Sequence, residues 1–269
     1  MIRGIDHLVI AVDDPDAAAS ELESVLGLAA RGGGRHAGLG TFNRIAWLAD
    51  GSYLELIGVD DREAALRHPV GAAAVRALDE HRGGLATFAL RDDGIETTVA
   101  TLRAIDDSFG PVVDGSRVRP DGEIVEWRYA FPAMPLGPEA PPFLIEHAAT
   151  GVEWGREAVR ERASFLHPIG SAVLLVRLDI ATDDPIGAAA GVHDGLGLDV
   201  MAVADLAVVD LGPHVLRYLP RREMTVPAVV TIGADLDAPR TAELLGLRFD
   251  VERVELIPTV DSPESAARR

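Results

Sequence analysis

A histidine and a glutamate near the start of the chain carry side chains that ligate divalent metal ions. His7 lies in the apolar stretch Asp6–Val12, and Glu55 lies in the apolar stretch Tyr53–Ile57. Imidazole and carboxylate groups are common ligands of Zn²⁺ and related ions, and a carboxylate in an apolar strand is costly to bury unless it is paired or liganded. If the leucines of both strands face the helices, strand alternation sends His7 and Glu55 to the same side. The pair therefore indicates the start of a metal site in a cleft; a structural hydrogen bond between the two, or an arginine partner for Glu55, is the alternative.

The elements between these two residues follow the order strand, helix and three strands. An aspartate just before Pro15 caps the helix, and the proline fits its first turn, where a missing N–H costs nothing. Gly27 ends the helix, and Asp50-Gly51 is a strong hairpin signal. The predicted elements are a strand over Ile5–Val12, a helix over Ala17–Leu26, and strands over His36–Asn43, Arg44–Ala49 and Ser52–Val59.

A similar order recurs along the chain. The third occurrence resembles the first most closely, because Leu178–Pro185 echoes Leu8–Pro15 and both lead into an Ala-rich helix that ends in Leu-Gly-Leu. A fourth, shorter version runs from a strand over Ala228–Ala234 to a helix from Pro239, which is expected to end at Leu245-Gly246-Leu247. We interpret this as an internal repeat, although such cap signals are also ordinary in an Ala- and Leu-rich chain. The second occurrence is predicted from a strand over Gly84–Leu90, a helix over Ile95–Ile105, extended segments at Val118 and Glu123–Phe131, and a closing strand over Phe143–His147.

These patterns predict an α+β fold. Repeated β-α-β-β-β modules are expected to form curved mixed sheets around a cleft, with the helices on the convex side. Residues 1–150 are expected to form the better-preserved pair of modules, and residues 165–258 a second, degenerate pair or half-pair. The segment Gly151–Ser164 is predicted to be a charged helical connector, and residues 259–269 a loose tail.

The composition is that of a folded globular protein and argues against several partner classes. The 269 residues are 48% hydrophobic and 25% charged, as in ordinary folded domains. The net charge of −18 argues against nucleic acid and anionic membranes as partners, because both attract clustered Lys and Arg. The chain has no cysteine, which removes disulfides, thiolate ligands and cysteine nucleophiles. We see no signal peptide and no apolar stretch of membrane-spanning length, so a cytoplasmic location is the default expectation.

At this point the residues indicate a family. The chain resembles the vicinal-oxygen-chelate superfamily, which includes glyoxalases and bleomycin-resistance proteins, and in particular its glyoxalase-like domain group. The resemblance covers a little over half of the chain and is more specific for fold than for reaction. It is carried by four segments in order, namely Asp6–Val12 with Asp14-Pro15, Gly33–His36 running to Gly40–Asn43, Gly51–Leu56, and Pro142–Glu146.

The resemblance implies a metal site built from the first and last strands of each module. Carried over position by position, it makes His7, Glu55 and Glu146 the metal ligands. The fourth position falls near Leu85 or Thr87, neither of which is a strong ligand, so the chain departs from the glyoxalase I pattern, and this departure argues against lactoylglutathione lyase activity. Three ligands with open positions still suit a catalytic divalent ion such as Ni, Zn, Mn, Co or Fe.

Further candidates come from the closing strand and the middle strands. Alternation lets only one of Glu146 and His147 face the cleft, and the resemblance favours Glu146. Glu146 and His36 are the candidate catalytic residues, because each can move a proton. The alternatives are a solvated His36, surface arginines and a core tryptophan. The candidate substrate-binding residues are Asn43, Arg117, Arg119 and Trp127, of which the arginines suit a carboxylate or enediolate.

The leading hypothesis is a divalent-metal-dependent enzyme of isomerase, lyase or dioxygenase type that acts on a small oxygen-rich substrate. Dioxygenase chemistry is the less favoured, because iron sites of that kind favour two His and one carboxylate. The alternative is a metal-free small-molecule binding or drug-sequestering protein of the bleomycin-resistance type. Such a cleft needs aromatic walls, and only 5% of the residues are aromatic. The expected partner is a small molecule, and the chain is expected to be a monomer or a homodimer.

Overall fold

The computed structural model describes residues 1–105 and 107–254, so the predicted tail over 259–269 lies outside the described residues. The first half contains β1 (Ile2–Ala11), α1 (Pro15–Leu26), β2 (Gly32–His36), β3 (Thr41–Trp47), β4 (Tyr53–Val59), α2 (Arg62–Leu66), α3 (Pro69–His81), β5 (Gly84–Asp92), α4 (Ile95–Arg103), β6 (Val113–Val118), β7 (Ile124–Ala130) and β8 (Phe143–His147). The connector contains α5 (Gly151–Trp154) and α6 (Arg156–Ala163). The second half contains β9 (Val173–Thr182), α7 (Pro185–Leu196), β10 (Val200–Val203), β11 (Leu206–Asp210), β12 (Val215–Pro220), a short 3-10 helix (Arg221–Glu223), β13 (Ala228–Ala234), β14 (Arg240–Leu244) and β15 (Leu247–Arg253).

The first eight strands close into a barrel in the order β1-β4-β3-β2-β6-β7-β8-β5. The pairs β1–β4 and β5–β8 are parallel, and the remaining neighbours are antiparallel. The strands β1 and β4, and likewise β5 and β8, therefore lie side by side. The predicted α+β class with curved sheets is confirmed.

The first helix begins and ends as its sequence predicts. The Asp14 carboxylate accepts hydrogen bonds from the backbone N–H groups of Asp16 and Ala17, and Pro15 stands in the first turn. Gly27 adopts a left-handed conformation with φ of 71° at the C-terminal cap, which costs a glycine little. Leu22 and Leu26 are buried on the inner face of the helix, so α1 holds the outer side of the barrel.

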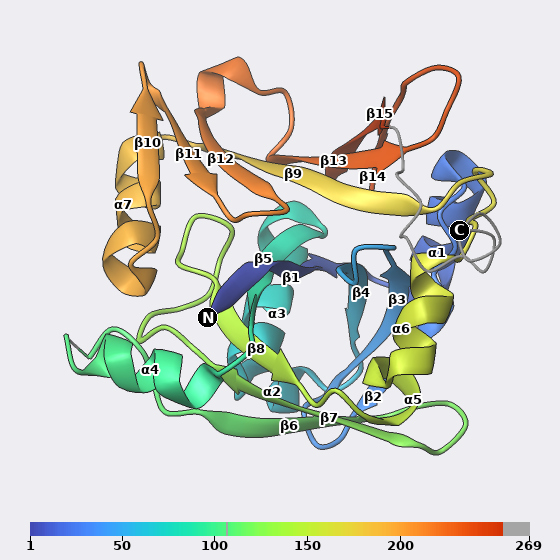
Figure 1. Cartoon of the computed structure of the whole chain (residues 1–269), viewed down its shortest axis with the longest axis horizontal. Coiled ribbons are helices and arrows are strands. Elements are labelled where there is room, and N and C mark those ends of the chain that lie inside the picture. Colours follow the sequence, from blue (N-terminus) through green and yellow to red (C-terminus); the bar gives the residue numbers. More distant parts are fainter. Residues whose placement is uncertain (106, 255–269) are drawn as a thin grey trace, which may run out of the picture.

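The second half forms an open seven-stranded sheet in the order β10-β11-β12-β9-β13-β15-β14. In Figure 1 this sheet lies across the top of the barrel. The helix predicted from Pro239 is wrong, because Arg240–Leu244 is a strand that pairs with β15. The residues Leu245 and Gly246, with φ of 54° and 70°, form the turn of this hairpin. Two consecutive positive φ angles are typical of a tight hairpin turn, so this Leu-Gly-Leu does not end a helix.

One hydrophobic core joins the two halves, and a second core fills part of the barrel. The shared core includes Leu8 and Leu54 of the barrel with Leu178 and Tyr218 of the second sheet. The inner core packs three alanines of α3 against the inward-facing residues of β1, β4 and β8, among them Val9, Ile57 and Phe143. The sequence reading assigned no element to α2 or α3, so the helix that narrows the barrel interior is new. Among the described residues, no helix has the length and apolar character needed to cross a membrane.

Candidate functional site

The barrel encloses a cavity of about 60 Å³. Four of the eight histidines of the chain line it, namely His7, His36, His68 and His147, together with Glu55. Titratable side chains with shifted pKa values in an enclosed cavity are typical of functional sites. This cavity is therefore the candidate active site.

Glu55 lies between two imidazole rings. Its Oε2 atom is 3.6 Å from His7 Nε2, and its Oε1 atom is 3.6 Å from His36 Nε2. Asn43 Nδ2 donates a hydrogen bond of 2.6 Å to Glu55 Oε1 and so fixes the carboxylate. His36 Nδ1 is hydrogen-bonded to Thr41 Oγ1 at 2.8 Å. The structure thus brings together His7, Glu55, His36 and Asn43, four of the residues singled out from the sequence.

Asp6 holds two of the cavity histidines and was missed by the sequence reading. Its Oδ1 atom accepts from His7 Nδ1 at 2.8 Å and from His147 Nε2 at 3.1 Å, and its Oδ2 atom accepts from Arg91 Nε at 2.8 Å. Burial alone raises the pKa of Asp6, but His147 and Arg91 outweigh it and hold the pKa well below its usual range. Asp6 is therefore a buried anion, and because its Oδ1 atom accepts from His7 Nδ1, the other ring nitrogen, Nε2, is the one that faces Glu55.

Burial also tunes the cavity histidines. It lowers the pKa of His36, and the nearby Glu55 carboxylate only partly opposes this. Burial lowers the pKa of His147 in the same way, against the effect of Asp6. A histidine with a lowered pKa is neutral at pH 7, which is the form that accepts a proton.

The closing strand faces the other way from the prediction. His147, with Phe143 and Ile145, lines the cavity, whereas Glu146 is outside it and its carboxylate pairs with Arg128. The expectation that Glu146 faces the cleft is wrong. Both faces of β8 are apolar because Leu144 packs in the outer core while Phe143 packs inside, so alternation alone did not determine its orientation.

The donor set does not fit the metal site that the resemblance implies. Only His7 and Glu55 of the three expected ligands lie in the cavity, and Thr87 is a buried residue whose hydroxyl has no hydrogen-bond partner. No group of three or more His, Asp or Glu side chains within residues 1–105 and 107–254 has a metal-binding arrangement. Protein sites for Zn²⁺ and similar ions use at least three such ligands.

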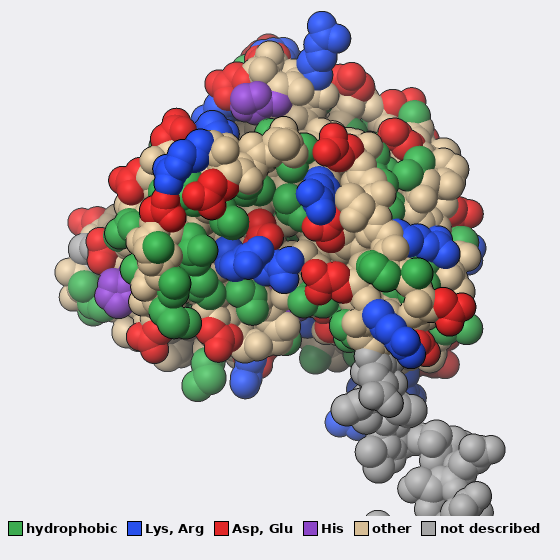
Figure 2. Space-filling view, turned by 90° about the horizontal axis from the view of Figure 1, so that it is seen from above, with side chains coloured by type: hydrophobic (Ala, Val, Ile, Leu, Met, Phe, Trp, Pro, Cys, Tyr) green, Lys and Arg blue, Asp and Glu red, His purple; other side chains and the backbone are tan. Residues whose placement is uncertain are grey.

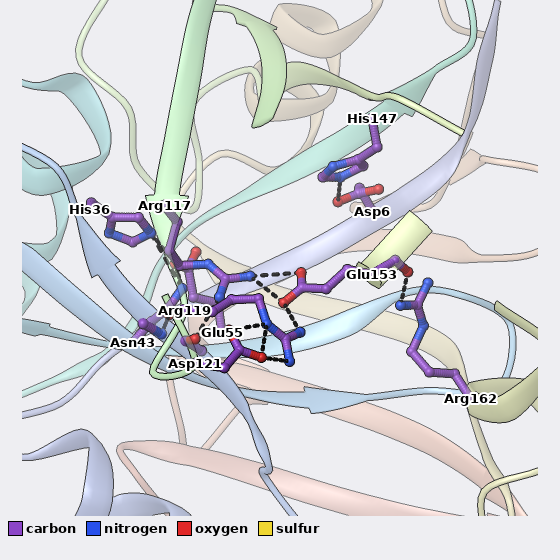
Figure 3. Close-up of polar contacts among 12 residues, drawn as sticks. Asp6, His36, Asn43, Glu55, Arg117, Arg119, Asp121, His147, Glu153 and Arg162 are labelled. Atoms are coloured by element: carbon purple, nitrogen blue, oxygen red, sulfur yellow. Dashed lines mark hydrogen bonds and ion pairs between the residues drawn. The ribbon is translucent and has the colours of Figure 1, made fainter. Parts of the chain in front are cut away.

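The expected substrate-binding residues of the second module lie at different depths. Trp127 lines the cavity and meets His36 edge-on, with ring centroids 6.1 Å apart. Arg117 also lines the cavity, but its guanidinium is bound to Glu153 of α5. Arg119 is not among the lining residues and binds Asp121 and Glu153 (Figure 3).

Two further histidines, His68 in the cavity wall and the buried His214, were not singled out in the sequence analysis. His68 lines the cavity and is hydrogen-bonded to the Tyr129 hydroxyl at 3.0 Å, and burial lowers its pKa to about 4. His214 is only 3% exposed and accepts from the backbone N–H of Ile5. The adjacent pair Asp6-His7 inside an apolar strand was the one available signal for the Asp6 role, since a buried carboxylate needs a partner.

The cavity is also richer in aromatic residues than the composition indicates. All three tryptophans of the chain and two of its three tyrosines line it. Tyr53 stacks on His7 with ring centroids 4.5 Å apart and planes 11° apart, which fixes the orientation of the imidazole. The low overall aromatic content is therefore no argument against an aromatic wall.

Comparisons with known proteins agree with this fold. A hypothetical protein from Staphylococcus aureus has a similar structure, with a TM-score of 0.76 and 16% identity over 93% of this chain and 99% of that chain. Methylmalonyl-CoA epimerases from Streptomyces coelicolor and Mycobacterium tuberculosis match 55% of this chain, and 100% and 89% of their own chains, at 19% and 18% identity. Both epimerases have TM-scores of 0.41, so the fold comparison rests on the staphylococcal protein.

No curated protein matches the sequence. The family model of the glyoxalase-like domain matches residues 5–195. This range is more than half of the chain, and it includes all of the barrel except the first three residues of β1, together with the connector. The chain therefore belongs to the glyoxalase-like domain family.

Proposed function

We propose that this protein is an enzyme of isomerase or lyase type that moves a proton on a small oxygen-rich substrate bound inside the barrel. The observation that carries the proposal is the position of Glu55 between His7 and His36, each of which is held through its Nδ1 atom. Rings held in this way present their Nε2 atoms to the cavity in a fixed orientation, which is what a general base requires.

The chemistry that suits this arrangement is removal of a proton from a carbon next to a carbonyl group. His7 Nε2 takes the proton, the C–H electron pair forms a C=C bond, and the π pair of the C=O bond moves onto the oxygen to give an enolate. Glu55 stabilises the imidazolium that forms, and Asn43 Nδ2, which donates to Glu55 Oε1, holds that carboxylate in place. Return of the proton to the other face or to a neighbouring carbon gives an isomer, and departure of a leaving group gives a lyase product.

Metal dependence, which the resemblance implies, forms no step of this proposal. His7 and Glu55 alone are too few ligands for a catalytic divalent ion, and the third expected ligand is paired with Arg128 outside the cavity. The proposal therefore assigns the proton transfer to side chains of the chain itself.

A metal-free binding protein is the second candidate. It is favoured by the three tryptophans, Trp47, Trp127 and Trp154, that line the cavity, because aromatic walls bind planar ligands by stacking. Binding without chemistry needs the aromatic residues but not the His7–Glu55–His36 cluster.

Solvent deuterium exchange distinguishes the two candidates without knowledge of the product. The full chain is incubated in D₂O with a panel of small 2-oxo acids, 2-hydroxy acids and thioesters, and loss of the C–H signal next to the carbonyl is followed by proton NMR. The proposal predicts exchange with at least one panel member, and loss of that exchange in Glu55→Gln. Ligands that change the tryptophan fluorescence but exchange no proton across the panel favour the binding protein and contradict the enzyme.

A further inference from the structure

A carboxylate of the chain itself occupies the most strongly cationic position of the cavity. Arg117 Nη2 donates to both oxygens of Glu153, at 2.9 and 2.7 Å, and Arg119 Nη1 donates to Glu153 Oε1 at 3.0 Å. The side chains of Arg117 and Glu153 are only 4% and 3% exposed. Arginine that binds both oxygens of a buried carboxylate is the usual recognition of a carboxylate ligand.

Glu153 comes from the connector and not from the barrel. It lies on α5, a helix of four residues, and the following α6 buries none of its residues. Figure 3 shows the Glu153 side chain reaching toward Arg117 and Arg119, while Arg162 lies on the opposite side of Glu153 and donates to its backbone carbonyl. A segment with so few buried residues is expected to open at low cost in free energy.

A few aromatic and cationic side chains also hold the connector against the barrel. Trp154 stacks on His147 with ring centroids 3.8 Å apart. The Arg162 guanidinium lies over Trp47 at 4.1 Å and over Trp154 at 4.8 Å. Glu153 and Trp154 both line the cavity, so the connector forms part of its wall at this end.

The cavity with the connector in place is small for a ligand. Its volume is about 60 Å³, whereas sites for small organic molecules usually have several hundred Å³. Movement of Glu153 and Trp154 away from the barrel enlarges the cavity. It also leaves Arg117 buried without a counter-charge, which is unfavourable unless another anion takes the place of Glu153.

We propose that Arg117 and Arg119 form a subsite for a carboxylate group of the substrate, and that Glu153 occupies this subsite when no substrate is bound. This inference rests on the proposed function in that the ligand enters the barrel cavity. A substrate carboxylate replaces the Glu153 carboxylate on Arg117, so the charge of Arg117 stays paired while the connector is released. Binding of an acid is therefore coupled to opening of the connector.

Tryptophan fluorescence tests this inference, because all three tryptophans line the cavity and Trp154 adjoins Glu153. The full chain is titrated at constant ionic strength with acetate and succinate, and with acetamide and succinamide as uncharged matches. Glu153→Gln removes the internal competitor and nearly keeps its shape, and the exposed Glu157→Gln on α6 is the matched control. Glu153→Gln is expected to bind the two acids about tenfold more tightly than the unaltered chain does, because less of the protein is held in the closed form.

Glu157→Gln is expected to behave as the unaltered chain, and the amides are expected to give no response. Equal affinity of Glu153→Gln and the unaltered chain for the acids, or equal binding of acids and amides, overturns the subsite. If Glu153→Gln does not fold, Glu153→Asp is used instead, because it keeps the charge on a shorter side chain. A gain in acid affinity of Glu153→Asp that is smaller than tenfold supports the subsite. No gain overturns it. Acid binding without deuterium exchange contradicts the proposed function alone, and exchange only on substrates without a carboxylate contradicts the subsite alone.

Discussion

The barrel and the second sheet present different chemistry on strands that stand at the same place in the element order. In the barrel, β1 pairs with β4 so that Val9 lies opposite Glu55; in the second sheet, β9 pairs with β12 in parallel so that Asp179 lies opposite Arg217. His7 stands two residues before Val9, and Arg177 stands two residues before Asp179. Where the barrel has a histidine and a glutamate, the second sheet therefore has two arginines.

These charged groups of the second sheet satisfy one another. Asp179 accepts from Arg217 at 2.7 and 2.6 Å and from Arg177 at 3.1 Å. Figure 2 shows the top of the molecule, above the second sheet, where basic and acidic side chains lie among one another. In the barrel, Glu55 has one hydrogen bond from Asn43 and two histidines at 3.6 Å. Charged groups that pair fully with one another stabilise the fold, whereas incompletely paired groups in a cavity can act on a ligand.

Closure of the sheet makes the second difference. The barrel has eight strands and encloses its inner face, while the second sheet has seven strands and stays open. No helix separates β13 from β14, so the last unit is shorter than the other three. An enclosed face excludes water and strengthens electrostatic interactions, and of the two sheets formed by the described residues, the barrel is the closed one.

The largest effect on the deuterium exchange rate is expected from substitution of His7. His7→Ala removes the proposed base, so the deuterium exchange rate is expected to fall by roughly a hundredfold or more. Arg177→Ala, at the corresponding position of the second sheet, is expected to leave the rate within about twofold, since substitutions far from a site usually act independently of it. Equal losses in the two variants contradict the assignment of the reaction to the barrel.

Truncation of a leucine in either half is expected to destabilise the whole chain. Leu54 of the barrel and Leu178 of the second sheet are fully buried in the same core. Leu54→Ala and Leu178→Ala are each expected to lower the free energy of unfolding by about 3 kcal/mol, in one cooperative transition measured by urea denaturation. Two separate transitions, of which each variant shifts only one, mean that the halves fold independently.

Removal of a carboxylate is expected to have opposite effects on stability in the two regions. Asp179→Asn leaves two arginines without their shared counter-charge and is expected to cost about 1 kcal/mol, a modest value because both arginines are partly exposed. Glu55→Gln is expected to raise the free energy of unfolding by about 1 kcal/mol, because a buried charge without a bound cation is removed. Thermal unfolding of both variants at pH 7 measures this, and a loss of stability in Glu55→Gln means that the Glu55 carboxylate stabilises the fold.

Acid is expected to destabilise the barrel through its buried histidines. Burial lowers the pKa of His68 in the folded state to about 4, against an ordinary value of about 6.5 in the unfolded chain. The unfolded state therefore binds the proton first, and stability falls as the pH drops from about 6.5 towards about 4. His68→Gln is expected to make this loss smaller, while His193→Gln, on the second half, is expected to leave it unchanged. Identical pH profiles of unfolding for all three proteins contradict the burial of His68.

Local signals predicted much of the fold. The Asp-Pro and Leu-Gly patterns placed α1 correctly, because caps act within a few residues. Strand alternation placed His7 and Glu55 on one face, because the leucines of those two strands mark the outer side clearly. The same kind of signal failed at Leu245-Gly246, where a glycine after leucine forms a hairpin turn and not the end of a helix.

The rest of the site depends on residues that only the folded chain brings together. His147 and Glu146 are neighbours on a strand that is apolar on both sides, so alternation did not decide between them. The three tryptophans come from β3, β7 and α5, and an average aromatic content says nothing of their convergence. The connector was predicted as a helix, but its contact with Arg117 arises from tertiary packing alone.

The central claim is that the histidines and carboxylates of the barrel form the reaction centre by themselves. Elemental analysis of tag-free full chain tests it most directly, with His7→Ala and Glu55→Ala analysed beside it after incubation with Ni, Zn, Mn and Fe(II). The account predicts metal far below one ion per chain, and the same trace level in all three proteins. Near-stoichiometric metal in the unaltered chain that disappears in both variants would contradict it and restore a metal centre at His7 and Glu55.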